Sequence, residues 1–126
     1  MQPNAKAMVV DDSRAIRMIL RRTLADLGWD VCEAANGREA FGLMESTPGI
    51  ELVLVDWNMP EVNGLEFVRL VRGRDRFRRT KLMMVTTETQ VEQMTEAIEA
   101  GANEYVMKPF TKDVIAGKLR IMGLVQ

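Results

Sequence analysis

Five short apolar runs alternate along the chain with longer stretches whose apolar residues recur at helical spacing. This alternation constrains the fold more strongly than any other feature of the sequence. The runs are Ala5–Val10, Trp29–Ala34, the residues leading through Val53–Val55 to Asp56, Leu82–Val85 and Glu104–Met107. Strict alternation of strand and helix with short connections indicates parallel strands joined by right-handed crossovers. The sequence therefore predicts an α/β fold with a doubly wound five-stranded parallel sheet in the order 2-1-3-4-5.

The stretches between the runs have the periodicity of amphipathic helices. We expect helices over 14–27, 37–47, 64–72, about 91–100, and from 111 or 112 to 122. Their apolar faces comprise Ile16, Ile19, Leu20, Leu24 and Leu27; Ala40, Phe41 and Met44; Leu65, Val68 and Val71; Val91, Met94 and Ile98; and Ile115, Leu119 and Met122. In the second strand, Asp30 and Glu33 indicate an edge position. Gly117 costs about 1 kcal/mol relative to alanine, so we expect the last helix to be the least stable.

The length of 126 residues suits a single domain, and we expect one domain over 1–126 with no output domain after it. The net charge of -1 provides no field to recruit nucleic acid or an anionic membrane. No apolar run approaches the roughly 20 residues of a membrane span. The single cysteine, Cys32, excludes an intrachain disulfide. That composition fits a reducing cytosol, so we expect a cytoplasmic protein.

Polar side chains stand where four of the predicted strands end. They are Asp11 and Asp12 after the first strand, Asp56 at the end of the third, Thr86 after the fourth and Lys108 after the fifth. Because the carboxyl ends of parallel strands meet at one edge of the sheet, we expect these side chains to converge on one cleft.

Three carboxylates in one cleft repel one another, so a cation must lie among them. The chain has no histidine and one cysteine, which leaves oxygen atoms as the available ligands. Hard oxygen ligands favour Mg²⁺, which keeps several waters and so leaves positions open for phosphate oxygens. The sequence therefore predicts a magnesium site beside Asp56.

Lys108 adds a second cation to this cleft, and Thr86 adds a hydroxyl donor. A nucleophile, a divalent ion and fixed donors are the parts that phosphoryl transfer uses. A carboxylate that attacks phosphorus forms an acyl phosphate. Taken singly, such residues are most often a helix cap, a strand-end threonine and a solvated lysine. Their joint occurrence at separate strand ends favours a phosphoryl-transfer site with Asp56 as nucleophile.

Four segments carry a resemblance to a known family: Val9–Asp12, Asp56–Pro60, Val85–Thr86 and Tyr105–Phe110. Along nearly its whole length the chain resembles the receiver domain of two-component response regulators, and it is most similar to the single-domain chemotaxis members. The resemblance implies a flavodoxin-like (βα)₅ fold and a phosphorylation-activated switch in a phosphorelay. It implies a regulatory phosphoacceptor rather than an enzyme, one that assists only its own phosphorylation and dephosphorylation.

The resemblance also implies a role for each matching residue. Asp56 is the phosphoacceptor, and Mg²⁺ is held by Asp12, Asp56 and the Asn58 carbonyl, with Asp11 acting through water. Thr86 and Lys108 grip the phosphoryl group, and a cis bond before Pro109 aims the lysine. Tyr105 is the aromatic that turns inward when Thr86 moves. Asn58 and Glu88 bracket the attacking water and tune dephosphorylation.

The partners implied by the resemblance are a histidine kinase, which donates the phosphoryl group, and a downstream target protein. The target binds the face formed by the fourth helix, the fifth strand and the last helix. We expect a monomer that binds neither nucleic acid nor a membrane.

The sequence departs from the family pattern at several places. Asn63 replaces a usual aspartate, which changes a turn and leaves the chemistry alone. Thr87 replaces a usually small residue at the phosphoryl entrance. The segment from Arg69 to Lys81 is heavily basic, and we expect a solvated loop there. The fourth helix carries Glu92, Glu96 and Glu99, where motor-binding members carry lysines, which argues against flagellar-motor binding.

Three other functions are compatible with parts of the pattern. A phosphatase of the haloacid-dehalogenase type would need an aspartate two residues after Asp56, where this chain has Asn58. A flavin carrier of the same topology would need a hydroxyl-rich loop where Asp11 and Asp12 stand. The third alternative, a receiver from a longer DNA-binding regulator, stays open on the sequence.

Overall fold

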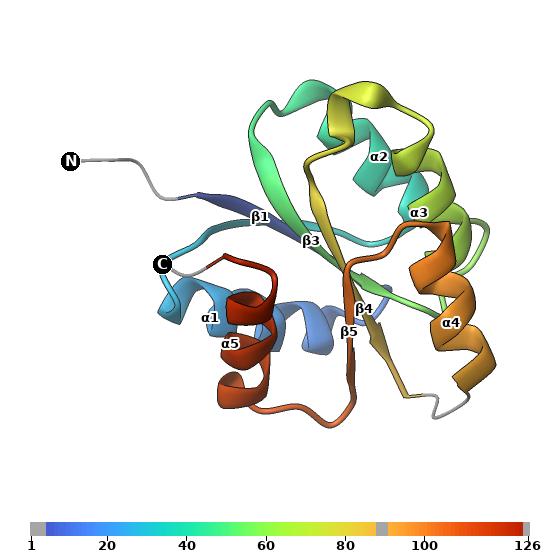
Figure 1. The fold of residues 1–126 in the computed structure, drawn as a ribbon. Helices are drawn as coiled ribbons and strands as arrows, with labels where there is room; N and C mark the ends of the chain where they lie inside the picture. Colours follow the sequence, from blue (N-terminus) through green and yellow to red (C-terminus); the bar gives the residue numbers. More distant parts are fainter. Residues whose placement is uncertain (1–4, 88–90, 125–126) are drawn as a thin grey trace.

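The computed structural model describes residues 5–87 and 91–124, without the side chain of Val91. Within these residues, five parallel strands form one sheet in the order β2-β1-β3-β4-β5 (Figure 1). The strands are β1 (Lys6–Val10), β2 (Asp30–Ala34), β3 (Ile50–Asp56), β4 (Lys81–Thr86) and β5 (Glu104–Met107). The predicted doubly wound order is confirmed, with the polar strand β2 at an edge.

Helices cover both faces of the sheet. They are α1 (Arg14–Asp26), α2 (Gly37–Ser46), α3 (Gly64–Arg72), α4 (Val91–Ala100) and α5 (Lys112–Ile121). Helices α1 and α5 lie on one face, and α2, α3 and α4 lie on the other (Figure 1). Among the described residues, no helix has the length and hydropathy needed to cross a membrane.

Side-chain caps fix where the helices begin. Asn63 accepts a hydrogen bond from the Glu66 amide at 2.9 Å, and Glu66 in turn accepts one from the Asn63 amide at 3.3 Å. This reciprocal pair satisfies backbone donors that the first turn of α3 leaves free. Asn63 is therefore the N-cap of α3, and it fixes where this helix begins after the loop that follows Asp56.

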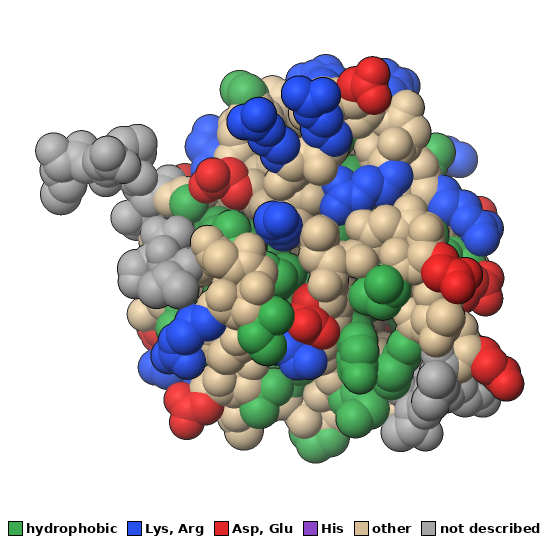
Figure 2. All heavy atoms as spheres, viewed as in Figure 1, with side chains coloured by type: hydrophobic (Ala, Val, Ile, Leu, Met, Phe, Trp, Pro, Cys, Tyr) green, Lys and Arg blue, Asp and Glu red, His purple; other side chains and the backbone are tan. Residues whose placement is uncertain are grey.

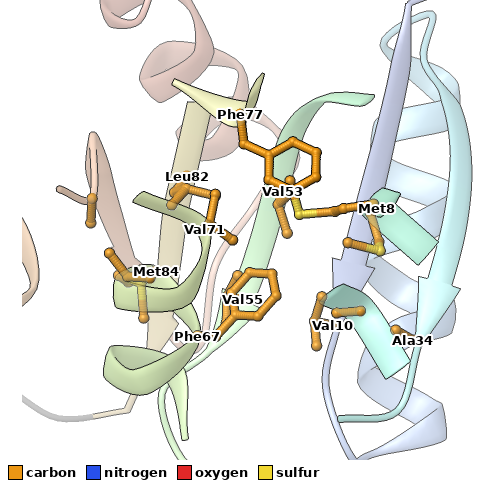
Figure 3. Close-up of a cluster of buried hydrophobic side chains, with 14 of the residues drawn as sticks. Met8, Val10, Ala34, Val53, Val55, Phe67, Val71, Phe77, Leu82 and Met84 are labelled. Carbon is orange, nitrogen blue, oxygen red and sulfur yellow. The ribbon is translucent and has the colours of Figure 1, made fainter. Parts of the chain in front are cut away.

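Each face of the sheet has its own buried apolar cluster. Alternate residues of a strand point to opposite faces, so β3 gives Val53 and Val55 to one cluster and Leu52 and Leu54 to the other. Figure 3 shows Phe67 of α3 beside Val55 in the first cluster. Burial on both faces explains why the strands read as nearly continuous apolar runs.

Two residues predicted to lie on apolar helix faces are exposed. Ile19 of α1 is 51% exposed and Ile98 of α4 is 44% exposed. In α1 the contact with the sheet runs through Leu20 and Leu24, which are fully buried. Ile19 lies about 100° around the helix from Leu20 and so faces away from the sheet. Met122, predicted to be buried, is half-buried just after α5 ends.

The basic segment between α3 and β4 is more ordered than the predicted solvated loop. It contains a short 3₁₀ helix, η1 (Asp75–Phe77), and the half-buried side chain of Arg72. Arg72 donates hydrogen bonds to the carbonyls of Gly101, Phe77, Arg78 and Thr80 at 2.9, 3.0, 3.4 and 2.8 Å, and to Asn103 Oδ1 at 2.9 Å. The prediction fits the exposed arginines of the segment and is wrong for Arg72.

Replacing Arg72 by methionine should destabilise the protein by about 2–4 kcal/mol, because several carbonyl groups would lose a charged donor together. Urea unfolding, followed by circular dichroism, measures this loss. Arg78→Met is the matched control, since Arg78 is exposed and accepts from Arg72 through its backbone carbonyl, which the substitution keeps. Equal losses in the two variants would show that Arg72 does not anchor the segment.

Candidate functional site

The carboxylates of Asp11, Asp12 and Asp56 meet at the carboxyl end of the sheet. Asp56 is the last residue of β3, and Asp11 directly follows β1, its neighbour in the sheet. One oxygen from each carboxylate lies within 4.8 Å of the others. Asp11 and Asp56 are buried, whereas Asp12 is exposed. Two like charges therefore lie inside the protein, and a third stands at the rim.

Lys108 reaches into this cluster from the end of β5. Its Nζ lies 3.2 Å from Asp11 Oδ2 and 3.3 Å from Asp56 Oδ1. The lysine side chain is only 19% exposed, so water weakens these contacts less than it would on the surface. The single ammonium group thus bridges the two buried carboxylates.

The burial and the charges of the cluster shift the pKa values of both Asp56 and Lys108. Burial raises the pKa of the Asp56 carboxyl, and the charge of Asp11 raises it further, while Lys108 opposes both effects. Burial alone would lower the pKa of Lys108, but the charges of Asp56 and Asp11 outweigh it and the pKa is raised. Lys108 therefore stays protonated at neutral pH, as one ammonium group among three carboxyl groups.

The donor set fits a divalent cation of the hard type. The three carboxylates supply oxygen atoms within a span that one ion can bridge. The chain offers no histidine, and Cys32 lies on β2 rather than among these strand ends. Oxygen ligands without imidazole or thiolate are the set that Mg²⁺ uses in proteins. The residues present therefore fit the predicted ion.

Thr86 stands between Asp56 and Lys108 in the sheet. In the pairing of β3 with β4, Asp56 lies opposite Val85, and Thr86 lies opposite Met107 in the next pairing. Thr86 is buried, and its carbonyl accepts a hydrogen bond from the Lys108 amide at 2.8 Å. A backbone hydrogen bond therefore joins the lysine to the threonine at the strand end beside Asp56.

The remaining predicted residues differ in how far the structure describes them. Asn58 is exposed. Its backbone amide donates a hydrogen bond to the Asp56 carboxylate, which lowers the pKa of that group. The role of the Asn58 carbonyl as a metal ligand stays a prediction. The peptide bond between Lys108 and Pro109 is cis. Glu88 lies outside the described residues.

Tyr105 lies on β5, half-buried, with Lys118 of α5 over its ring. Lys118 Nζ is 4.7 Å from the ring centroid and 3.2 Å from Glu104 Oε1. Tyr105 and Thr86 also line the same narrow cavity beneath α4, together with Met94. The tyrosine and the threonine at the end of β4 thus border one cavity.

The sequence reasoning missed two residues that position this site. Arg17 Nη1 donates to the Asp11 carbonyl at 2.6 Å, and its Nε lies 3.2 Å from Glu33 Oε1. Gly64 packs so tightly that an added Cβ would lie 2.8 Å from the Asp56 carbonyl oxygen and 3.0 Å from Trp57 Cα. The only sequence signal for Gly64 was its place directly after a helix cap. Many residue types can occupy that position, so the signal did not indicate that glycine is required there.

Gly64→Ala should cost about 1–3 kcal/mol of stability and slow phosphoryl uptake, since the backbone around Asp56 must shift. Gly117→Ala makes the same chemical change in open space inside α5, where it should stabilise by about 1 kcal/mol. Urea unfolding of both variants, with an uptake assay for Gly64→Ala, checks the pair. Equal tolerance of the two changes would mean that the turn after Asp56 is not tightly packed.

Comparisons with known proteins agree with this geometry. The response regulator receiver domain family matches residues 7–120. The chain is 42% identical over 118 residues to chemotaxis protein CheY1 of Helicobacter pylori strain J99, covering 93% of this chain and 95% of the relative. It is 44% identical over 115 residues to the chemotaxis protein CheY homolog of Campylobacter jejuni, covering 90% and 88%. The structure of Vibrio cholerae CheY4 superposes with a TM-score of 0.88 at 36% identity, covering 94% of this chain and 98% of that one.

Proposed function

The chain belongs to the response regulator receiver domain family, and from that premise we propose that it is a phosphorylation-activated switch in which Asp56 accepts the phosphoryl group. One observation carries the assignment of the site: Asp11, Asp12 and Asp56 converge within 4.8 Å, with Lys108 Nζ 3.3 Å from Asp56 Oδ1. A carboxylate nucleophile with a fixed cation beside it is arranged for attack on phosphorus.

The transfer follows from these positions. An oxygen of Asp56 attacks the phosphorus of a phosphohistidine, the bond from phosphorus to nitrogen breaks, and an acyl phosphate remains on Asp56. Lys108, held by Asp11, is placed to pair with the oxygens of the arriving group, and the Thr86 hydroxyl is placed to donate to another. The product stays on the chain, so the protein is a regulatory phosphoacceptor that acts on no separate substrate.

Asp11, Asp12, Asp56 and the Asn58 carbonyl would hold Mg²⁺ beside the phosphoacceptor. When bound, the ion supplies the positive charge that lets a phosphate approach a carboxylate cluster. The chain's own residues set the rest of the site. Arg17 fixes the backbone at Asp11, and Gly64 lets the turn after Asp56 close.

The relatives named chemotaxis proteins support a role in chemotaxis signalling, with a histidine kinase as donor. The test is transfer from the chemotaxis kinase of the same organism, labelled with radioactive ATP and then mixed with the chain. Label should leave the kinase and appear on wild-type protein but not on Asp56→Asn. Label that stays on the kinase, while small phosphodonors still modify Asp56, would contradict the choice of kinase.

The output surface is proposed to be the face of α4, β5 and α5. Figure 2 views this face and shows apolar side chains gathered over it. The exposed apolar residues of these elements include Ile98, Met107 and Val114, and Tyr105 of β5 is half-buried. Because Tyr105 and Thr86 line one cavity, a movement of Thr86 towards the phosphoryl group can alter this face. We propose that a downstream target protein reads the change.

The acidic side of α4 suggests the chemistry of that target. Glu92, Glu96 and Glu99 are exposed. Their negative charge favours a target surface rich in Lys and Arg, unlike the flagellar-motor peptide, which binds family members that carry lysines on this helix. Reversing Glu92 and Glu96 to lysine should weaken target binding, more strongly at low salt. Calorimetry at two salt concentrations, with Glu39→Lys on α2 as control, measures this. An unchanged affinity in the double variant would contradict the electrostatic contribution.

We place the protein in the cytoplasm as a monomer, with residues 1–126 forming a single receiver domain. The reducing environment suggested by one cysteine supports the location, and the near-complete coverage of CheY1 supports a chemotaxis receiver over part of a DNA-binding regulator. Sedimentation with and without beryllofluoride, which mimics the acyl phosphate, tests the monomer. Reading the full gene tests the domain assignment.

A further inference from the structure

A cavity of about 350 Å³ lies at the end of the sheet opposite Asp56. It opens between the turn that joins α2 to β3 and the segment that precedes β4. Met44, Ile50 and Phe77, all buried, form its apolar floor. Arg76, Arg79 and Glu51 line its exposed part. Its size and mixed lining are those of small-molecule sites, and none of the phosphoryl-site residues contributes to it.

Aromatic contacts hold Arg76, which lines the cavity, and the neighbouring Arg74. The guanidinium carbon of Arg76 lies 5.0 Å from the Phe77 ring centroid, and its Nη2 donates to the Glu45 carbonyl at 3.4 Å. Arg74 lies 5.3 Å from the ring of Phe41, which meets Phe77 edge to face at 5.9 Å. An arginine already held on a ring loses less rotamer freedom when it binds an anion, so Arg76 is prepared to bind one.

Positively charged residues are concentrated in the segment beside the cavity. Five of the 17 basic residues fall within 74–81, although the net charge of the protein is -1. Figure 2 shows Lys and Arg side chains gathered at the end of the molecule where α3 connects to β4. Arg72 does not contribute a free donor there, because its hydrogen bonds go to backbone carbonyls and Asn103. Arg74 is paired with Glu45 at 3.4 Å. The other cations of the segment create a local field that attracts anions.

The side chains that line the cavity indicate which class of anion it can bind. The apolar floor suits a ring, and the two arginines suit phosphate oxygens, for which the guanidinium fork is well matched. Glu51 would repel a bare phosphate but would accept hydrogen bonds from hydroxyl or amino groups. We propose that this cavity binds a nucleotide-like anion, with its phosphate at Arg76 and Arg79, its ring against the apolar side chains of Met44 and Ile50, and its donor groups towards Glu51. This site is independent of the function proposed for Asp56.

The test uses ADP as the probe, in chelator so that no metal carries it to the acidic cluster. Amide resonances of uniformly ¹⁵N-labelled protein should move in the α2–β3 turn and in residues 76–80, and those of Asp11, Asp56 and Lys108 should stay. Arg76→Gln and Arg79→Gln should each weaken binding about tenfold, as expected for loss of one charged hydrogen-bond donor. Arg78→Gln is the matched control, because Arg78 belongs to the same segment and does not line the cavity.

Several outcomes would overturn the proposal. An equal loss in Arg78→Gln would show diffuse attraction by the basic segment rather than a site. Adenosine or pyrophosphate binding as tightly as ADP would exclude the nucleotide-like class. Shifts confined to the acidic cluster, or none at millimolar ADP, would exclude the cavity. Phosphoryl uptake at Asp56 by the two arginine variants verifies that they are folded.

Discussion

Replacing Asp56 by asparagine will abolish phosphoryl uptake from acetyl phosphate or phosphoramidate, and a chelator will do the same to the wild-type chain. The amide cannot attack phosphorus, although its shape is close to that of the carboxylate. Without a divalent cation, three carboxylates face the incoming anion, and the single charge of Lys108 does not offset them. Intact mass spectrometry should count one phosphoryl group on wild-type protein with Mg²⁺ and none in the other two samples.

Two controls make this result specific. Asp113→Asn removes an exposed carboxylate on α5 and should leave uptake unchanged. Incubation with ATP alone should give no uptake, because the chain has no histidine to receive a phosphoryl group first. Uptake that persists in chelator, or that is undiminished in Asp56→Asn, would defeat the assignment of the phosphoacceptor.

Lys108→Ala should slow phosphoryl uptake about a hundredfold, the usual loss when one charged partner of the transferred group is removed. Its ammonium lies 3.3 Å from Asp56 Oδ1, and the variant would also leave two buried carboxylates without their shared cation. Thr86→Ala should disturb the phosphorylated state as well. Tyr105→Ala should leave uptake nearly unchanged, because Tyr105 lies on the output side of β5 against Lys118.

Output should show the opposite pattern for the tyrosine variant. Beryllofluoride should raise target affinity in wild-type protein by about 1–3 kcal/mol, and Tyr105→Ala should lose most of that gain. Neutralising Arg76, Arg78 and Arg79 should leave the gain intact, because the segment before β4 lies at the opposite end of the sheet from Thr86. If Tyr105→Ala slowed uptake as much as Lys108→Ala, the proposed division between chemistry and signalling would be wrong.

The sequence predicted most of the fold because its local signals agree with one another. Buried parallel strands read as apolar runs, and Gly and Asn mark the turns, so the element bounds and strand order follow from periodicity and chirality. The periodicity did not show how wide each helix contact is, which is why Ile19 and Ile98 were misplaced. Nor could composition show that Arg72 binds carbonyls on two loops, since its partners are backbone atoms that any residue provides.

Because parallel strands align their carboxyl ends, the positions of Asp11, Asp56, Thr86 and Lys108 at strand ends predicted that they meet at one edge of the sheet. Those positions did not predict the distances between the side chains. The bridging of both buried carboxylates by Lys108 depends on the backbone after β5, and the tight approach of Gly64 depends on the packing of α3. The cavity beneath the basic segment was missed for a related reason, because charge in sequence does not reveal a hollow.

The central claim is that modification at Asp56 changes the face of α4, β5 and α5. The most direct measurement compares amide resonances of ¹⁵N-labelled protein before and after addition of beryllofluoride with Mg²⁺. We expect shifts at Asp56, Thr86 and Lys108 that continue through Tyr105 into the exposed residues of α4 and α5, and that largely fail to reach Tyr105 in Thr86→Ala. Shifts confined to the loops around Asp56, with the resonances of Tyr105, α4 and α5 unmoved in wild-type protein, would contradict the switch.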